Sequence, residues 1–146
     1  MTQSTRPSIE QVMMAVASTM ALRSTCPRLN VGAVIAKDGR IVSTGYNGAP
    51  AGMPHCPPKD QHTQPCTDAI HAETNAIVYA ARAGISTNGA TLYCTHAPCA
   101  PCARLVASAG ITKMVYGDTY RSEQGLAELK FLGIQIAYLP KEHQLP

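Results

Sequence analysis

Two short segments, far apart in the chain, carry side chains that together form one metal site and therefore have to meet in the fold. His71-Ala-Glu73 supplies an imidazole and a carboxylate, and Pro98-Cys-Ala-Pro-Cys102 supplies two thiols three positions apart. Zinc bound by one His and two Cys keeps its fourth position open for water, as catalytic zinc sites do. Glu73 comes two residues after His71, so on a helix it points to a different side and suits a proton carrier better than a fourth ligand. The sequence thus predicts a catalytic zinc held by His71, Cys99 and Cys102.

Both segments are predicted to lie at helix N-termini. Asp68 can cap a helix that continues to about residue 83, and Pro98 opens another that continues to about residue 109. Cys99 and Cys102, three positions apart in a first helical turn, lie on one face and can reach the same ion. The positive end of the helix dipole there favours the thiolate forms that zinc requires.

The Cys-x-x-Cys pair has two other interpretations. A redox pair normally belongs to a thioredoxin-like βαβ unit and needs no His-x-Glu segment. A structural zinc site needs a fourth protein ligand, and Cys94 is the nearest spare thiol. Cys94 alternates with Leu92 in an expected strand, however, which predicts a buried core position. The catalytic interpretation is therefore preferred.

The hydrophobic pattern predicts one α/β domain over residues 1–146. From the second strand onward, strands and helices alternate, which favours a partly parallel sheet covered by helices. Strands are expected at residues 31–36, 40–45, 90–95, 113–116 and 134–139, and helices at 8–23, 68–83, 98–109 and 122–132. The first helix is expected to have one apolar face formed by Ile9, Val12, Met13, Val16 and Met20.

Charge and composition argue against two kinds of partner. The net charge is +3 and the Lys and Arg residues are scattered, whereas nucleic-acid binders gather basic residues on one face, so no nucleic-acid partner is expected. The apolar stretch 12–22 is short and interrupted by Ser and Thr, so no membrane span is expected. Six cysteines without a secretory signal predict thiols or metal ligands, and a cytoplasmic location.

Four segments of the chain resemble the deoxycytidylate (dCMP) deaminases of bacteria, phages and eukaryotes, within the cytidine deaminase superfamily. The His-Ala-Glu and Pro-Cys-x-x-Cys segments are shared by the superfamily. The Gly-Tyr-Asn-Gly segment and Asn75 are more particular to dCMP deaminases. The segments are Cys26-Pro-Arg-Leu-Asn-Val-Gly-Ala-Val-Ile35, Gly45-Tyr-Asn-Gly-Ala-Pro50, His71-Ala-Glu-Thr-Asn-Ala-Ile77 and Pro98-Cys-Ala-Pro-Cys102. The resemblance implies a three-layer sandwich in which helices cover a five-stranded mixed sheet.

The resemblance also implies an activity and its regulation. The implied reaction is hydrolytic deamination of dCMP to dUMP and ammonia, which supplies dUMP for thymidylate synthesis. Glu73 would take a proton from the attacking water and pass it to the ring nitrogen and then to the leaving amine. Activation by dCTP, inhibition by dTTP, Mg²⁺ on each triphosphate and a homohexamer are further implications of the resemblance.

Candidate nucleotide-binding residues follow from the resemblance and from side-chain chemistry. Asn47, flanked by glycines, has an amide suited to a sugar hydroxyl, and Asn75 is also expected at the substrate. Arginine can grip a phosphate through two parallel hydrogen bonds, although a surface arginine is more often simply solvated. The phosphate candidates are Arg28, Tyr120 and Arg121. Arg104 could instead belong to the exposed surface of its helix. The weaker candidates for the regulatory nucleotide are Lys37, Tyr46, Asn47, Gly48 and Arg82.

A second, structural zinc is expected in the proline-rich stretch 50–65, where neither a helix nor a central strand can persist. Bacterial and phage dCMP deaminases often carry cysteines at the positions of Cys26 and Cys56 for such a site. A closed Cys₃His site would tie this stretch to the loop before the first strand. The expected ligands are Cys26, Cys56, His62 and Cys66, with His55 in reserve. The alternative is scattered cysteines with no metal.

Three other functions fit parts of the sequence. tRNA adenosine deaminases share the zinc pattern but show a more basic surface, and free-cytidine deaminases carry Cys-Ala-Glu where this chain has His71-Ala-Glu. A non-enzymatic module that binds two zinc ions would leave Glu73 and the open metal position without a purpose. His96, close to Cys99, is a candidate to line the pocket, and His143 is expected to be exposed near the C-terminus.

Overall fold

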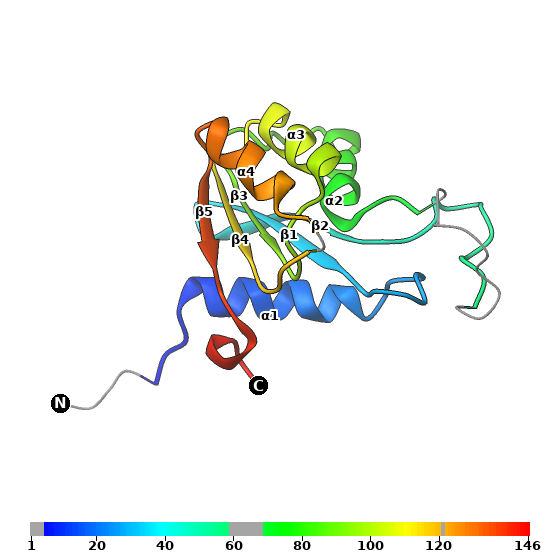
Figure 1. Ribbon diagram of the computed structural model, residues 1–146, viewed down its shortest axis with the longest axis horizontal. Helices are drawn as coiled ribbons and strands as arrows, with labels where there is room; N and C mark the ends of the chain where they lie inside the picture. Colours follow the sequence, from blue (N-terminus) through cyan, green and yellow to red (C-terminus); the bar gives the residue numbers. More distant parts are fainter. Residues whose placement is uncertain (1–4, 59–68, 121) are drawn as a thin grey trace.

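A five-stranded sheet forms the middle layer of the computed structural model, which describes residues 5–58, 69–120 and 122–146 (Figure 1). Strand β1 pairs antiparallel with β2 and β3, whereas β3, β4 and β5 run parallel. The spatial order is β2-β1-β3-β4-β5, which confirms the predicted mixed sheet. The bounds are β1 (Gly32–Lys37), β2 (Arg40–Tyr46), β3 (Thr91–Cys94), β4 (Lys113–Tyr116) and β5 (Gln135–Tyr138).

The β1–β2 hairpin positions the segment that follows β2. Its turn residues, Asp38 and Gly39, have φ angles of 52° and 73°. Positive φ at both central residues is the mark of a type I′ turn, which matches the twist of paired strands and favours Asp-Gly. The resulting register pairs Tyr46 with Gly32, so the residues after β2 run beside the loop that leads into β1.

Helices cover both faces of the sheet. One face carries α1 (Ile9–Ala21), and the other carries α2 (Ala72–Arg82), α3 (Ala100–Ser108) and α4 (Gln124–Phe131) (Figure 1). Each side has its own cluster of buried apolar side chains, as a three-layer sandwich requires. Within the described residues, none of the helices has the length and apolar character needed to cross a membrane.

The face of α1 that packs on the sheet is only partly the predicted one, because Met13 is buried and Val16 packs against the core as predicted, but Ile9 and Val12 do not. Ile9 and Val12 are 45% and 37% exposed, whereas Met14 and Ala17 are fully buried. The physical reason is the close approach of β1, because a Cβ atom on Gly32 would lie 3.0 Å from the carbonyl carbon of Ala17. A helix that touches a strand through its backbone turns small side chains toward the contact. The spacing of the large apolar residues does not show this rotation.

Candidate active site

The His71, Cys99 and Cys102 side chains meet where α2 and α3 begin. His71 is the N-cap of α2, Cys99 is the N-cap of α3, and Cys102 lies in the first turn of α3. The Nδ1 atom of His71 lies 3.2 Å from Cys102 Sγ and 3.4 Å from Cys99 Sγ, and the three ligand atoms all lie within 4.8 Å of one another. Zinc–sulfur bonds of ~2.3 Å and zinc–nitrogen bonds of ~2.0 Å place tetrahedral ligand atoms roughly 3.3 to 3.8 Å apart. These three residues therefore fit a zinc ion.

The two N-cap side chains are used for something other than capping. Neither His71 nor Cys99 makes a side-chain cap hydrogen bond, which leaves the ring nitrogen and the thiol facing each other. In α3, Pro101 occupies the first turn, where a missing backbone N–H costs nothing. Helix α2 begins at Ala72, a few residues later than predicted from a cap at Asp68, which lies outside the described residues.

Cys94 stays out of the site, as the sequence predicted. Its side chain is fully buried in β3, and burial raises its pKa well above the ordinary thiol value. Within the part of the chain that the structure describes, His71, Cys99 and Cys102 are the one group of three or more His, Cys, Asp or Glu residues that could hold a metal. A zinc ion there would have three protein ligands and an open position, which is the arrangement of catalytic zinc.

The proton balance of the ligands couples metal binding to pH. A hydrogen bond from the Cys102 thiol lowers the pKa of Cys99 to about 4, and the same contact raises the pKa of Cys102 above its ordinary value. The hydrogen bond with Cys99 raises the pKa of His71. Zinc requires two thiolates and a neutral imidazole, so its binding releases protons, and the affinity for zinc should increase with pH.

Glu73 lies in the first turn of α2 and faces the same centre. Its side chain is only 4% exposed, and burial raises its pKa to about 7 from an ordinary value of 4.5. The positive charge of His71 opposes this shift, and the negative charge of Cys99 adds to it. A carboxyl group that titrates near neutral pH can both accept and donate a proton, which is what a proton carrier has to do.

The raised pKa of Glu73 predicts how the stability of the metal-free protein depends on pH. The folded state binds more protons at Glu73 than the unfolded state between pH 4.5 and about 7, so the free energy of unfolding falls as the pH rises through this window. The loss amounts to about 3 kcal/mol. Glu73→Gln removes the titration, and urea unfolding at about pH 5 and about pH 8 should show that the variant lacks this loss. Equal pH dependence of the two proteins would contradict the burial of an ionisable Glu73.

A pocket of about 420 Å³ is lined by His71, Cys99 and Glu73, while the third ligand, Cys102, lies buried behind them. The structure brings Arg28, Asn47 and Tyr120, three of the predicted substrate residues, to the wall of this pocket. Arg121 lies outside the described residues, and Asn75 faces a different cavity. Arg104, which was expected on the helix surface rather than at the phosphate, forms a two-point ion pair with Glu128 at 2.8 and 2.9 Å.

The Asn47 side chain is largely engaged within the protein. Its Oδ1 accepts hydrogen bonds from the Val31 N–H at 2.8 Å and the Ser24 hydroxyl at 2.5 Å, and its Nδ2 donates to the Leu29 carbonyl at 2.7 Å. These bonds tie residues 24–31, which include Arg28, to the end of β2. Asn47 therefore shapes the pocket wall, and only its second Nδ2 hydrogen is left for the predicted contact with a sugar hydroxyl.

His96 lines the pocket, as predicted, and so does Thr119, for which no role was predicted from the sequence. His96 lies 2.9 Å through Nδ1 from the Thr95 hydroxyl, and burial lowers its pKa, so the ring is neutral at pH 7. Thr119 lies beside Tyr120 on the same wall. Both segments directly follow parallel strands, β3 and β4, and the carboxyl ends of such strands are where α/β sheets bind ligands. That rule would have pointed to both residues.

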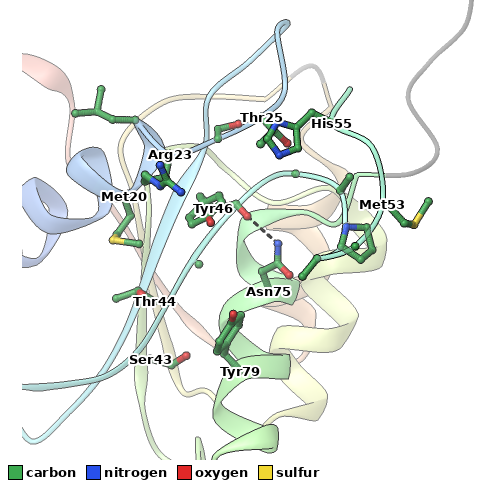
Figure 2. A pocket seen from close by; sticks show the side chains of 18 of the residues that line it. Met20, Arg23, Thr25, Ser43, Thr44, Tyr46, Met53, His55, Asn75 and Tyr79 are labelled. Carbon is green, nitrogen blue, oxygen red and sulfur yellow. Dashed lines mark hydrogen bonds between the residues drawn. The ribbon is translucent and has the colours of Figure 1, made fainter. Parts of the chain in front are cut away.

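A second and larger groove, of about 950 Å³, shares the segment 46–48 with the catalytic pocket. Figure 2 shows Arg23, Tyr46, His55 and Tyr79 around this groove, with Asn75 donating from Nδ2 to the Tyr46 carbonyl at 2.7 Å. The predicted substrate residue Asn75 thus supports the wall of the second groove.

The residues predicted for the regulatory nucleotide do not form one cluster. Tyr46 and Gly48 line the second groove, and Asn47 lines the catalytic pocket. Lys37, at the end of β1, and Arg82, in the last turn of α2, line neither cavity.

The predicted ligands of a second zinc are only partly described. Cys26 and Cys56 are both half-buried, and Cys26 lines the catalytic pocket. His62 and Cys66 lie outside the described residues, and the reserve ligand His55 lines the second groove. The second zinc therefore stays a prediction.

Comparison with known proteins gives the same assignment as the geometry. Residues 7–118 match the family described as the cytidine and deoxycytidylate deaminase zinc-binding region. ComE operon protein 2 of Bacillus subtilis is 43% identical over 129 residues, which cover 85% of this chain and 67% of that protein. The deoxycytidylate deaminase of Enterobacteria phage T4 is 35% identical, with 90% of each chain covered.

A solved structure shows the same fold. The dCMP deaminase of cyanophage S-TIM5, in complex with dCMP and dUMP, superposes with a TM-score of 0.83 and 36% sequence identity, covering 91% of this chain and 98% of that one. The family match covers most of the chain, including His71, Glu73, Cys99 and Cys102. The chain is therefore an enzyme of the cytidine and deoxycytidylate deaminase family.

Proposed function

We propose that the protein hydrolyses dCMP to dUMP and ammonia, with Glu73 as its catalytic residue. The observation that carries this proposal is the buried Glu73 carboxyl group, which lies beside the His71, Cys99 and Cys102 ligand set and lines a pocket of about 420 Å³. Zinc bound by this set supplies the activation of water as a nucleophile at neutral pH. The similarity to deoxycytidylate deaminases of phages supports dCMP as the substrate.

The chain's own residues then move the protons. The ionised Glu73 carboxylate accepts a proton from the attacking water and delivers it to the ring nitrogen of the cytosine. It next carries the second proton of the water to the amine that leaves C4, so that dCMP and water become dUMP and ammonia. Because Glu73 is buried beside the metal ligands, the same carboxyl group can serve first as base and then as acid.

Arg28 is proposed to bind the substrate phosphate from the pocket wall. Its guanidinium can form two parallel, charge-assisted hydrogen bonds to phosphate oxygens. Arg28→Ala should raise KM for dCMP about 10-fold and change kcat less, because the lost contact acts on binding. Arg40→Ala is the matched control, since Arg40 is exposed on β2 and lines neither cavity. Steady-state kinetics that give both variants the same KM would refute this role for Arg28.

The proposed substrate is tested by measuring ammonia release separately from dCMP, deoxycytidine and a tRNA. The proposal expects turnover of dCMP with much slower reaction of deoxycytidine, which lacks the phosphate, and none of tRNA. Turnover of tRNA with dCMP unreacted would favour an adenosine deaminase. Absence of all three reactions in the zinc-loaded protein would refute dCMP as the substrate.

The second groove is proposed to bind the regulatory nucleotides, dCTP as activator and dTTP as inhibitor, each with Mg²⁺. Arg23 could pair with a triphosphate and Tyr79 could stack on a base, and both line the groove. The Thr25 hydroxyl, also at the groove, is buried and has no hydrogen-bond partner among the described residues. Adding each nucleotide to the dCMP assay, with and without Mg²⁺, tests this regulation.

The remaining proposals come from the family resemblance, except for the location, which comes from the cysteine content. They are a homohexamer, a role in supplying dUMP for thymidylate synthesis, a cytoplasmic location and the second zinc at Cys26, Cys56, His62 and Cys66. Metal analysis that finds two zinc ions per chain would support the second site, and one zinc ion per chain would refute it.

A further inference from the structure

Two glycines lie directly against the backbone of the two segments that carry the metal ligands. Gly125, in the first turn of α4, faces the Pro98–Cys99 backbone, and Gly45, on β2, faces the first turn of α2. Both glycines are buried. Gly125 therefore packs against the segment that contains Cys99, and Gly45 packs against the helix that follows His71.

Gly125 leaves no room for a side chain. A Cβ atom there would lie 2.9 Å from the carbonyl carbon of Pro98 and 3.0 Å from that of Cys99, and closer still to the Pro98 carbonyl oxygen. Ordinary contact begins at about 3.4 Å, and a backbone cannot move aside as the end of a flexible side chain can. The Arg104–Glu128 ion pair further ties α4 to α3, so an added atom would press on the Cys99 segment.

Gly45 makes the corresponding contact on the other half of the site. A Cβ atom there would lie 2.6 Å from the Ala76 backbone nitrogen, and closer to the Ala72 carbonyl oxygen. The neighbouring Ser43 hydroxyl donates a hydrogen bond of 2.6 Å to the Ala76 carbonyl, and the two contacts together seat α2 on β2. Helix α2 starts directly after His71 and carries Glu73, so its seating sets the position of both side chains.

We propose that Gly45 and Gly125 are positioning residues for the metal centre, which fix how far His71 stands from Cys99 and Cys102. Protein interiors are closely packed, so a clash of several tenths of an ångström displaces the backbone rather than being absorbed. Metal sites tolerate deviations of only about 0.2 Å in their ligand distances. A methyl group at either position should therefore loosen the metal without removing any ligand. This inference rests on zinc binding by the three ligands and is independent of which nucleotide is the substrate.

Gly32 provides a matched control. A Cβ atom on Gly32 would lie 2.6 Å from the Ala21 backbone nitrogen, and closer still to the Ala17 carbonyl oxygen, so its clash with backbone is at least as severe as that at Gly45. Its neighbour, however, is α1, which packs on the opposite face of the sheet and carries no metal ligand. Gly32→Ala should therefore lower the melting temperature through the same kind of backbone clash while leaving the metal centre in place.

The experiment compares Gly45→Ala, Gly125→Ala and Gly32→Ala in the full chain loaded with zinc. Transfer of zinc to a colorimetric chelator gives the release rate, and the absorption bands of the Co²⁺-substituted proteins report ligand geometry. Zinc release should be about 10- to 100-fold faster in the Gly45 and Gly125 variants, the range found when the support of a metal ligand is removed. Their Co²⁺ bands should shift. Gly32→Ala should match the wild type in both measurements.

Three outcomes would overturn the proposal. In the first, Gly45→Ala and Gly125→Ala release zinc at the wild-type rate. In the second, Gly32→Ala speeds release as much as they do, which would indicate general loosening of the fold. In the third, neither Gly45→Ala nor Gly125→Ala folds while Gly32→Ala does, because the two glycines would then serve the fold as a whole. If only one of them folds, its release rate relative to Gly32→Ala decides the matter.

Discussion

Replacement of Glu73 by glutamine is expected to lower kcat for dCMP about 10³-fold, the effect typical of losing a positioned proton carrier. Glutamine has nearly the same shape and fits the buried site, so the pocket and the ligands His71, Cys99 and Cys102 should keep their geometry. The amide cannot accept the proton of the attacking water at neutral pH. Steady-state kinetics, with the zinc content of each preparation measured by elemental analysis, would check the result.

The control for this substitution is Glu142→Gln, which removes one negative charge from an exposed position near the C-terminus. It should leave kcat unchanged. A Glu73→Gln protein that contains zinc and turns over dCMP at the wild-type rate would contradict the role of Glu73 as proton carrier. Loss of zinc together with activity would instead show that Glu73 supports metal binding.

Replacement of Cys102 by alanine is expected to remove zinc and to lower activity more than about 100-fold, beyond the range for changing the neighbours of a ligand. Cys102 is buried, and its Sγ lies 3.2 Å from His71 Nδ1, so a neighbouring side chain cannot easily take its place. Zinc content by elemental analysis and dCMP turnover are the two measurements.

Cys94→Ala is the matched control, because Cys94 is equally a buried cysteine but lies in β3 and is not part of the ligand cluster. This variant should keep its catalytic zinc and its activity and lose about 1 kcal/mol of stability, the ordinary result of a small core truncation. The assignment of ligands would be wrong if Cys94→Ala lost zinc and Cys102→Ala retained it.

The positions of the strands and helices and the Cys99–Cys102 ligand pair were predictable because they depend on local signals, whereas the meeting of this pair with His71 depends on the fold. Asp38-Gly39 selects the hairpin turn, and the proline before Cys99 places the start of α3. Ligand spacing of three residues in a helical turn brings Cys99 and Cys102 together on any helix. These features need no knowledge of the tertiary contacts.

The assignment of asparagines to cavities was not predictable from local signals. Asn47 was predicted to bind the substrate, and its amide mainly holds the loop that includes Arg28. Asn75 was predicted at the substrate as well, and it supports Tyr46 beside the second groove. Asn47 lines the catalytic pocket and Gly48 lines the second groove, so the Gly45-Tyr-Asn-Gly48 segment contributes to both cavities. The packing of α2 on β2 places Asn75, and hydrogen bonds to residues 24–31 place Asn47.

The helix α1 and the two positioning glycines show a related limit. From the sequence alone, a glycine within a strand or helix predicts a less stable element, since glycine lowers the intrinsic stability of both. At Gly32, Gly45 and Gly125 it marks contact between two backbones, and the partner comes from a distant part of the chain. Such contacts decide which face of α1 is buried, and they are invisible to helical periodicity.

The most direct test of dCMP deamination is a competition experiment with the zinc-loaded protein. Equal concentrations of dCMP and deoxycytidine are incubated together, and dUMP and deoxyuridine are separated by chromatography over time. If the pocket binds the 5′-phosphate through charge-assisted hydrogen bonds, dUMP should form at least about 100-fold faster than deoxyuridine. Formation of deoxyuridine at an equal or higher rate, or of neither product, would contradict the assignment.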